Sequence, residues 1–389
     1  MRGIHRLKGV IKHYDWGGTS FISSLLQEEN KEGAPFAEYW MGTHSQGPSL
    51  VETNGSYQQL KDHTGELSFL FKVLDVDDML SIQVHPTKEA AEKEFARENE
   101  EAIPLDSPKR NYKDANHKPE LMVALGDFSL LHGFKPPEEL VYTLLNVVEL
   151  RELLPVFNQS GYPGLYRYVM EMPQAEVNRI LQPMLDNIQG VYADNAADKK
   201  DEDYWANKAA MRFTRNGDID RGIFSIYLLN LVQLEKGQGI FQSAGVPHAY
   251  LKGQNVEIMA SSDNVLRGGL TTKHIDTKEL MKHIKCEATY PQVIIPENVN
   301  EHEKIYPTVV EDFRLSVFEL KKGETTSFKS LDNVILVVTE GKVAVTNDQT
   351  RLDCEPGAPS IAVFPGEQIK LDALTETIVF RASGDIHSR

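Results

Sequence analysis

Ser81-Ile82-Gln83-Val84-His85-Pro86 has the pattern of a buried strand that ends by presenting two metal-type ligands. Side chains alternate between the two faces of a strand, so Gln83 and His85 point the same way and Val84 points to the other face. Pro86 has no N–H group to donate and therefore stops the strand. Thr87 can then cap a helix that we expect over residues 87–100. By itself, a Gln-x-His pair is more often a structural strand end than a metal site.

The chain before this stretch also has a β pattern. Residues 67–82 are rich in Leu, Phe and Val and are interrupted by an acidic tip at 75–78, which predicts a hairpin or a bent strand pair. Short apolar pieces separated by Gly and Pro predict strands and loops over the first 60 residues. The aromatic side chains of this region could line a sugar pocket, but we expect them in the core: Trp16, Tyr39 and Trp40.

Residues 135–218 change to a helical period and predict an all-helical insert. One helix begins at Pro137, with acidic residues in its first turn. A second helix begins at Pro173, with Pro183 as a kink or boundary, and a third covers 196–212. The insert carries no candidate catalytic cluster, so we expect its role to be structural.

Strand patterns return after the insert. Ile223 to Leu234 is an almost continuous apolar run, which predicts a strand buried on both faces. A Gly-rich turn at 235–239 and a second short strand lead to Gly245-Val246-Pro247-His248. From Thr308 onward, regularly spaced short strands with Gly or Pro turns predict a small β-sandwich or jelly roll. The fold class expected is therefore mainly β with an α-helical insert.

Bulk properties limit the classes of partner. A length of 389 residues predicts two or three domains, and the net charge of −16 argues against nucleic acid. The apolar runs are strand-sized, and the first residues lack the apolar segment of a secretory signal, so we expect neither a membrane partner nor export. Cys286 and Cys354 are expected to be isolated thiols in a reducing compartment. We expect a cytoplasmic monomer that acts on a small molecule.

The order of strand, Gly-rich turn, strand and Gly-Val-Pro-His resembles the cupin barrel, in which the histidine after the turn is a metal ligand facing the interior. Residues 359–366 have a similar turn without a histidine. The resemblance implies a double cupin (jelly-roll) architecture with a metal in the N-terminal barrel only. The domains expected are a catalytic cupin domain (1–134 plus 219–290), a helical insert domain (135–218) and a C-terminal cupin-like β domain without metal (291–389).

Four stretches together resemble the type I phosphomannose isomerases. Residues 112–120 (YKDANHKPE) look like the first signature of that family, and 248–273 look like the second. Residues 39–44 (YWMGTH) and 81–86 also match in place, so the resemblance covers most of the chain in the right order. Two positions depart from the family pattern: Gly268 stands where Ala is usual and Thr272 where Pro is usual. Both lie in the stretch assigned to phosphate binding, and they leave the identity of the sugar open.

The resemblance implies one Zn²⁺ per chain, held by Gln83, His85, Glu120 and His248. The set is chemically reasonable because two imidazoles, a carboxylate and an amide oxygen leave room at the ion for water or sugar hydroxyls. Mn²⁺ or Fe²⁺ would also accept nitrogen and oxygen ligands, so the choice of zinc depends on the resemblance. Three other histidines fall outside the ligand positions: His44, His117 and His132.

The reaction implied is the interconversion of mannose 6-phosphate and fructose 6-phosphate by proton transfer through an enediol(ate). It needs a positioned base, an electrophile for the developing oxyanion and an anchor for the phosphate. Arg267 matches the active-site arginine of the family. Glu257 and Lys118 are candidates for the base, Asp263 is a third, and the sequence does not choose among them. The substrate contacts implied are Ser81, Tyr250, Asp263 and Lys273.

Three other functions are compatible with parts of the pattern. A non-catalytic metal-binding cupin that senses sugar phosphate would keep the metal ligands but would not need Arg267 together with a nearby acid. A metal-dependent oxygenase usually depends on a histidine-rich iron site, and Gln83 as a ligand makes a redox role less natural. An isomerase of a related aldose phosphate remains open because of Gly268 and Thr272.

Overall fold

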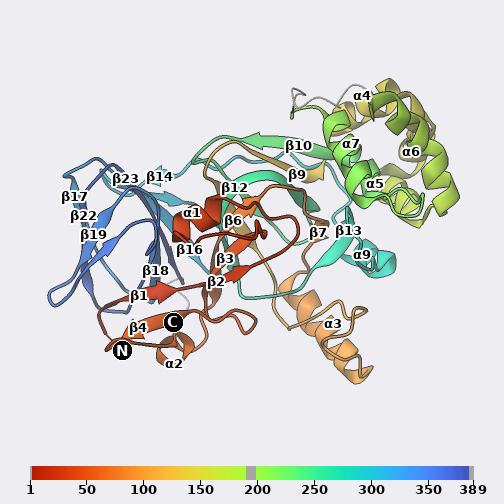
Figure 1. Cartoon of the computed structure of the whole chain (residues 1–389). Coiled ribbons are helices and arrows are strands. Elements are labelled where there is room, and N and C mark those ends of the chain that lie inside the picture. Colours follow the sequence, from red (N-terminus) through yellow and green to blue (C-terminus); the bar gives the residue numbers. More distant parts are fainter. Residues whose placement is uncertain (1, 190–198, 385–389) are drawn as a thin grey trace.

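Strands dominate the computed structural model, which describes residues 2–189 and 199–384, and a separate group of helices lies at one end (Figure 1). This confirms the expected class of a mainly β chain with a helical insert. None of the helices in the described ranges has the length and apolar character needed to cross a membrane. Cys286 and Cys354 are both unpaired thiols, as predicted.

The central sheet has ten strands and surrounds the site. Its main path is β10-β9-β12-β6-β3-β2. Four further strands attach to it: β7 and β8 pair with β12, β13 pairs with β7, and β11 pairs with β8. The strands are β2 (Val10–Lys12), β3 (Glu38–Gly42), β6 (Phe69–Val76), β7 (Ile82–Val84), β8 (Glu120–Ala124), β9 (Phe128–Phe134), β10 (Leu229–Leu234), β11 (Gly239–Gln242), β12 (His248–Ala260) and β13 (Leu266–Gly269).

The long strand β12 organises this sheet. Both β6 and β7 pair antiparallel with it, Val76 opposite Gly253 and Gln83 opposite His248. Of the two arrangements predicted for residues 67–82, the bent strand pair is therefore the observed one, because β6 and β7 follow each other along the same neighbour. The strand β7 ends at Val84, two residues before Pro86. Thr87 caps α3 (Lys88–Glu100) by accepting a hydrogen bond from the Ala90 N–H group, as expected.

A second β unit contains a nine-stranded and a four-stranded sheet (Figure 1, mostly blue, with the N-terminal strands β1 and β4 in red and orange). The nine-stranded order is β14-β15-β16-β23-β18-β21-β1-β4-β5, and the smaller sheet is β17-β22-β19-β20. The bounds are β1 (Ile4–Lys8), β4 (Leu50–Thr53), β5 (Ser56–Gln59), β14 (Glu297–Asn298), β15 (Glu303–Tyr306), β16 (Arg314–Leu320), β17 (Thr325–Lys329), β18 (Val334–Glu340), β19 (Val343–Thr346), β20 (Arg351–Cys354), β21 (Ser360–Val363), β22 (Gln368–Ala373) and β23 (Thr377–Ser383).

The two β units share a hydrophobic core. Alternate residues of the central sheet, such as Phe71 and Val73 of β6, pack with Val337 and Phe380 from the nine-stranded sheet. The N-terminal strand β1 pairs with β21, so three N-terminal strands continue the C-terminal sheet. The intervening residues of β6 point the other way, toward the site, because the side-chain period of a strand is two.

The helical group consists of α4 (Pro137–Asn146), the 3₁₀ helix η1 (Val148–Leu153), α5 (Leu154–Glu171), α6 (Gln174–Gln189) and α7 (Glu202–Phe213). The helix predicted from Pro137 is confirmed. Of the kink or boundary predicted at Pro183, the boundary is wrong, because α6 continues through this residue and buries Leu181, Met184 and Leu185. The third predicted helix begins at Glu202; its expected start at 196–198 lies outside the described residues. Three short helices lie elsewhere: α1 (Phe21–Leu26), α2 (Lys61–Thr64) and α9 (Thr277–His283).

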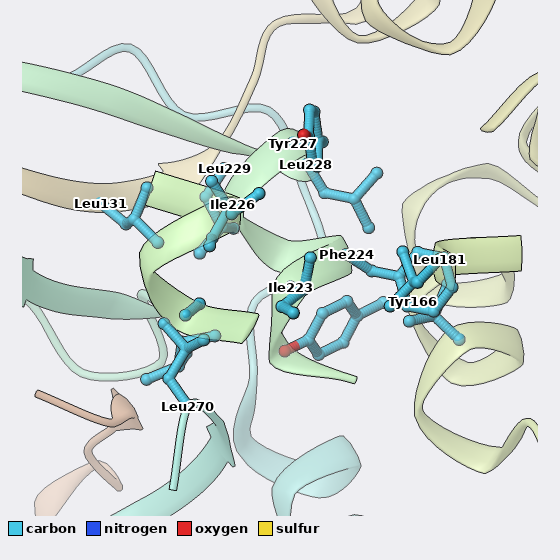
Figure 2. Packing of buried hydrophobic residues seen from close by; sticks show 14 of the residues in the cluster. Leu131, Tyr166, Leu181, Ile223, Phe224, Ile226, Tyr227, Leu228, Leu229 and Leu270 are labelled. Atoms are coloured by element: carbon cyan, nitrogen blue, oxygen red, sulfur yellow. The ribbon is translucent and has the colours of Figure 1, made fainter. Parts of the chain in front are cut away.

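The strand predicted over 223–234 is only half correct. Residues Gly222–Leu228 form helix α8, and the strand β10 begins at Leu229. Every residue of α8 is buried, so the helix is apolar all round and leaves no amphipathic period to read. In Figure 2, Ile223 and Phe224 lie toward Tyr166 and Leu181 of the insert, which explains the burial on that side.

Candidate metal centre and substrate cleft

Three neighbouring strands place polar side chains in one row. His248 of β12 is directly opposite Gln83 of β7, and Gln83 is directly opposite Arg267 of β13. Residues directly opposite each other in antiparallel strands project from the same face. The row therefore sets an imidazole, an amide and a guanidinium side by side on one face of the sheet. A bulge after Arg267 shifts the register before Gly269.

A buried group with metal-ligand chemistry lies at this row. Ligand atoms of His85, Glu120 and His248 all lie within 4.8 Å of one another. The His85 Nε2 atom is 3.4 Å from Glu120 Oε1, and His248 Nε2 is 3.4 Å from Glu120 Oε2. Gln83 comes to the same place because it is the cross-strand neighbour of His248. The structure thus brings together the four predicted ligands, which are Gln83 on β7, Glu120 on β8, His248 on β12 and His85 just after β7.

The two imidazoles are oriented to offer lone pairs. His85 Nδ1 lies 2.9 Å from the Asn264 carbonyl oxygen, and His248 Nδ1 lies 3.0 Å from that of Val246. A carbonyl oxygen can only accept, so each Nδ1 carries the hydrogen and each Nε2 keeps its lone pair for the centre. His85 Nε2 is buried and has no hydrogen-bond partner in the described structure. Burial lowers the pKa of His85, which favours the neutral imidazole that a metal requires. These residues fit a divalent ion.

A cleft of about 610 Å³ opens in front of the row. A smaller cavity of about 50 Å³ shares Lys72, Gln83 and Lys118 with it and is also lined by Glu120 and His248. The cleft receives side chains from the central sheet, from the loop near Tyr14 and from the helical insert. The predicted residues that line it are Ser81, Gln83, Lys118, Asp263, Arg267 and Lys273, with Thr272 beside them. Tyr250 and Glu257 line the smaller cavity.

Arg267 is a largely buried cation that faces the cleft. In residues 2–189 and 199–384, no carboxylate lies within ion-pair distance of its guanidinium. Burial lowers the pKa of Arg267, yet a guanidinium stays protonated at neutral pH. Burial and the charge of Arg267 also lower the pKa of Lys273. This end of the cleft therefore favours an anion.

Lys72 is a functional candidate that our sequence analysis missed. Its Nζ atom is 2.9 Å from Glu257 Oε1, and the Tyr250 hydroxyl donates to Glu257 Oε2 at 2.7 Å. Burial would lower the pKa of Lys72, but neighbouring carboxylates, Glu257 first, raise it above its usual value. The signal was available: a lysine in the apolar run 69–76 must face a polar site or carry a buried partner.

The other base candidates also have fixed partners. Lys118 Nζ lies 2.9 Å from Glu120 Oε1. Asp263 lies 3.3 Å from His44 Nε2 and accepts a hydrogen bond of 2.8 Å from Gln46. Burial would raise the pKa of Asp263, but the bond from His44 and two nearby lysines lower it below its usual value. Asp263 is thus an anion on the cleft wall.

The remaining sequence predictions divide between the cleft and the core. Tyr39 packs in the core as expected. Trp40 is also buried in an apolar cluster, as expected, but it lines the cleft as well, and Trp16 packs partly buried against the core and lines the cleft too. The alternation of β3 explains the difference, because neighbouring residues face opposite sides. His117 contacts Asp312 at 3.0 Å, and His132 is the cross-strand neighbour of His248. Neither belongs to the group of three metal-type ligands.

Comparisons with known proteins agree with this geometry. The family model "Phosphomannose isomerase type I, catalytic domain" matches residues 4–137. The mannose-6-phosphate isomerase of Escherichia coli K12 is 34% identical over 379 residues, covering 91% of this chain and 93% of that protein. The human mannose-6-phosphate isomerase is 31% identical, covering 97% of each. The mannose 6-phosphate isomerase of Salmonella typhimurium, solved bound to its substrate fructose 6-phosphate and a zinc atom, has a TM-score of 0.87 and 31% identity, covering 98% of this chain and 100% of that one.

Proposed function

The chain belongs to the type I phosphomannose isomerases, and we propose that its cleft interconverts D-mannose 6-phosphate and D-fructose 6-phosphate. It is therefore an aldose–ketose isomerase, and zinc is its cofactor. We assign the zinc to Gln83, His85, Glu120 and His248. The observation that carries the proposal is the buried group of His85, Glu120 and His248, which lies beside an Arg267 that forms no ion pair with a carboxylate of the described residues.

Each side chain of the row would have a separate task. A bound zinc ion supplies a Lewis acid that polarises a substrate oxygen. Arg267 donates hydrogen bonds to the oxygen that becomes negative as the enediolate forms. Its position one strand away from Gln83 supports this role.

The proton transfer between C1 and C2 needs a base and an acid. We propose that the Glu257 carboxylate accepts the carbon-bound proton and returns it, because Lys72 and Tyr250 hold it in place as an anion. Lys118, an ammonium group 2.9 Å from Glu120, is placed to donate a proton to a substrate oxygen. Asp263 is the alternative base, since it is an anion on the same cleft.

We further propose how the substrate lies. Lys273 and Ser81 contact the phosphate, and Tyr250 and Asp263 contact the sugar hydroxyls. This explains how a chain of net charge −16 binds an anion, because lysine and arginine side chains outnumber carboxylates in the lining of the cleft. Fructose 6-phosphate is the ligand we expect from the solved Salmonella relative.

We propose the three predicted domains, with the N-terminal strands β1, β4 and β5 added to the C-terminal one, and a double cupin with the metal in the N-terminal barrel only. Support comes from the second β unit, whose described interior is a cluster of apolar residues, including Leu336 and Val363, with Cys354 as its one sulfur. Such a core offers no set of metal ligands. We also propose a cytoplasmic monomer, on the basis of the unpaired thiols and the small-molecule substrate.

Chelation tests this assignment. Removing divalent metal should abolish formation of fructose 6-phosphate from mannose 6-phosphate in a coupled assay, and Zn²⁺ should restore it. Arg267→Ala is the matched variant: we expect turnover to fall by several orders of magnitude while one zinc per chain is retained, because Arg267 is not a ligand. Full activity without bound metal would refute the metal role, and loss of zinc from the variant would make Arg267 structural.

Two alternative functions are tested separately. A panel of aldose phosphates, with each product identified, distinguishes an isomerase of a related aldose phosphate from a mannose 6-phosphate isomerase. A sugar-phosphate sensor would bind the sugar phosphate without turnover.

A further inference from the structure

We propose that Asp220 is a positioning residue for the isomerase reaction, because its carboxylate fixes the turn that carries Arg267 and Lys273 to the cleft. The inference depends on the proposed function, which assigns those two cations to the substrate. Asp220 lies between the helical insert and α8, far in sequence from the turn it binds. Asp220 falls within the predicted catalytic domain but was not among the predicted site residues.

Three backbone N–H groups converge on the Asp220 carboxylate. Oδ1 accepts from Gly222 at 2.7 Å and from Leu270 at 2.9 Å, and Oδ2 accepts from Thr271 at 3.2 Å. Hydrogen bonds to a charged acceptor are among the stronger ones in proteins. One bond holds the start of α8, and the other two hold the turn after β13. A single side chain therefore ties the insert side of the molecule to the cleft wall.

The turn has a conformation that must be held from outside. Leu270 has a φ of 54°, which is uncommon for a residue with a side chain, and it is buried beside α8 (Figure 2). Gly269 has a φ of 130°, and a Cβ there would come within 2.4 Å of the Gly222 Cα atom. Such strained backbone persists only where its surroundings fix it, and it is often found at functional sites. Asp220 supplies the two hydrogen bonds that fix this turn.

The position of the turn explains its relevance to the reaction. Arg267 comes directly before the bulge of β13, and Lys273 comes two residues after Thr271. Both cations line the cleft, together with Thr271 and Thr272. If the turn relaxes, Arg267 and Lys273 move relative to the substrate, although the metal ligands on β7, β8 and β12 stay in place.

Two variants separate positioning from folding. Asp220→Asn keeps the size of the side chain but turns one acceptor toward Thr271 into a donor. Asp220→Ser retains one acceptor for the Gly222 N–H group at the start of α8 and loses the bonds to the turn. Asp218→Asn is the control, since Asp218 is an exposed acid two residues away that does not line the cleft. The measurements are KM and kcat for mannose 6-phosphate, zinc content, thermal unfolding, and binding of inorganic phosphate by calorimetry.

We expect both Asp220 variants to keep their zinc and to bind inorganic phosphate about 10-fold or more weakly, in line with the loss of a charge-assisted hydrogen bond. KM should rise and kcat fall, while Asp218→Asn stays unchanged. The Asp220→Asn and Lys273→Ala effects on phosphate binding should be less than additive, because they act through the same contact. Phosphate binding and kinetics within twofold of wild type in a folded Asp220→Ser variant would overturn the proposal, as would fully additive effects. A wild-type protein without isomerase activity would instead refute the proposed function. In that case, phosphate binding by the Asp220 variants would still test the positioning role of Asp220.

Discussion

At the scale of single residues, Gly268 shows how a departure from the family pattern is accommodated. A Cβ at this position would lie 2.9 Å from the Tyr166 hydroxyl oxygen and 3.1 Å from the Ile82 Cγ2 atom. Tyr166 is fully buried, and its hydroxyl is 3.4 Å from Ser225 Oγ. The hydroxyl thus takes the space that an alanine methyl would need. Gly268 lies beside the insert and β7 and is not among the residues that line the cleft, which favours a role in packing.

The pair can be tested by a double-mutant cycle. Gly268→Ala should lower the free energy of unfolding by about 1–3 kcal/mol, because an extra methyl in a packed core forces its neighbours to move. Tyr166→Phe removes the hydroxyl, so Gly268→Ala in that background should cost much less. Urea unfolding of the four proteins gives the coupling, and Tyr168→Phe, a change at an exposed tyrosine of the same helix, is the control. Equal costs in both backgrounds would show that Tyr166 does not set the constraint.

Single residues also show what a sequence can reveal about a site. His85, Glu120 and His248 could be found because they lie in long stretches that resemble a family, and the structure brings them together. Lys72 and Asp220 could not be found in that way. Both residues depend on partners that only the folded chain brings into contact. The partner of Lys72 is 185 residues away in sequence, and those of Asp220 in the turn are 50 and 51 residues away.

At the scale of elements, local pattern failed where tertiary packing decides. The run from Ile223 to Leu234 is almost continuously apolar, so it carries neither a clear helical nor a clear strand period, and its first half is helix α8. Pro183 lacks an N–H group and could have ended the helix, yet α6 continues through it with Leu181, Met184 and Leu185 buried around it. Elements with a clear signal were predicted well, such as α3 with its Thr87 cap.

A prediction about a single element concerns helix α9, whose buried acid Glu279 connects it to neighbouring residues. Burial would raise the pKa of Glu279, but hydrogen bonds from His283, Lys282 and Tyr112 lower it to about 2. The usual value in an unfolded chain is about 4.3, so the folded pKa is the lower one. Ionised Glu279 therefore stabilises the fold above about pH 4.3, and this contribution is lost as the pH falls toward 2.

We accordingly expect Glu279→Gln to lower the free energy of unfolding at neutral pH and to differ less and less from wild type between about pH 4.3 and 2. Urea unfolding of both proteins without zinc, at a series of pH values, measures this difference without the pH dependence of metal binding. Glu101→Gln is the control, since Glu101 is half exposed at the end of α3. A difference that stays constant down to pH 2 would contradict the role of the Glu279 charge.

At the scale of the whole molecule, the two β units are joined more closely than the sequence predicts. Regular strand spacing predicted a β-sandwich in the C-terminal part, but no local pattern shows that β1 pairs with β21 or that Phe71 and Phe380 share one core. Such pairings depend on contacts between the two ends of the chain. As a result, the sheet that carries the metal group packs directly against the second β unit (Figure 1).

Because the core is shared, we expect a destabilising substitution in the second β unit to destabilise the central sheet, which carries the site, as well. Leu336 lies in the interior of that unit, and Leu336→Ala should cost about 2–5 kcal/mol. The three tryptophans, Trp16, Trp40 and Trp205, all lie outside it, so their fluorescence reports on the central sheet and the insert. If the shared core couples the two units, Leu336→Ala should lower the urea midpoint measured by tryptophan fluorescence and the midpoint measured by circular dichroism together. Leu331→Ala, at an exposed leucine, is the control and should change neither midpoint. A fluorescence midpoint that stays at the wild-type value while the circular dichroism midpoint falls would mean that the two units unfold independently.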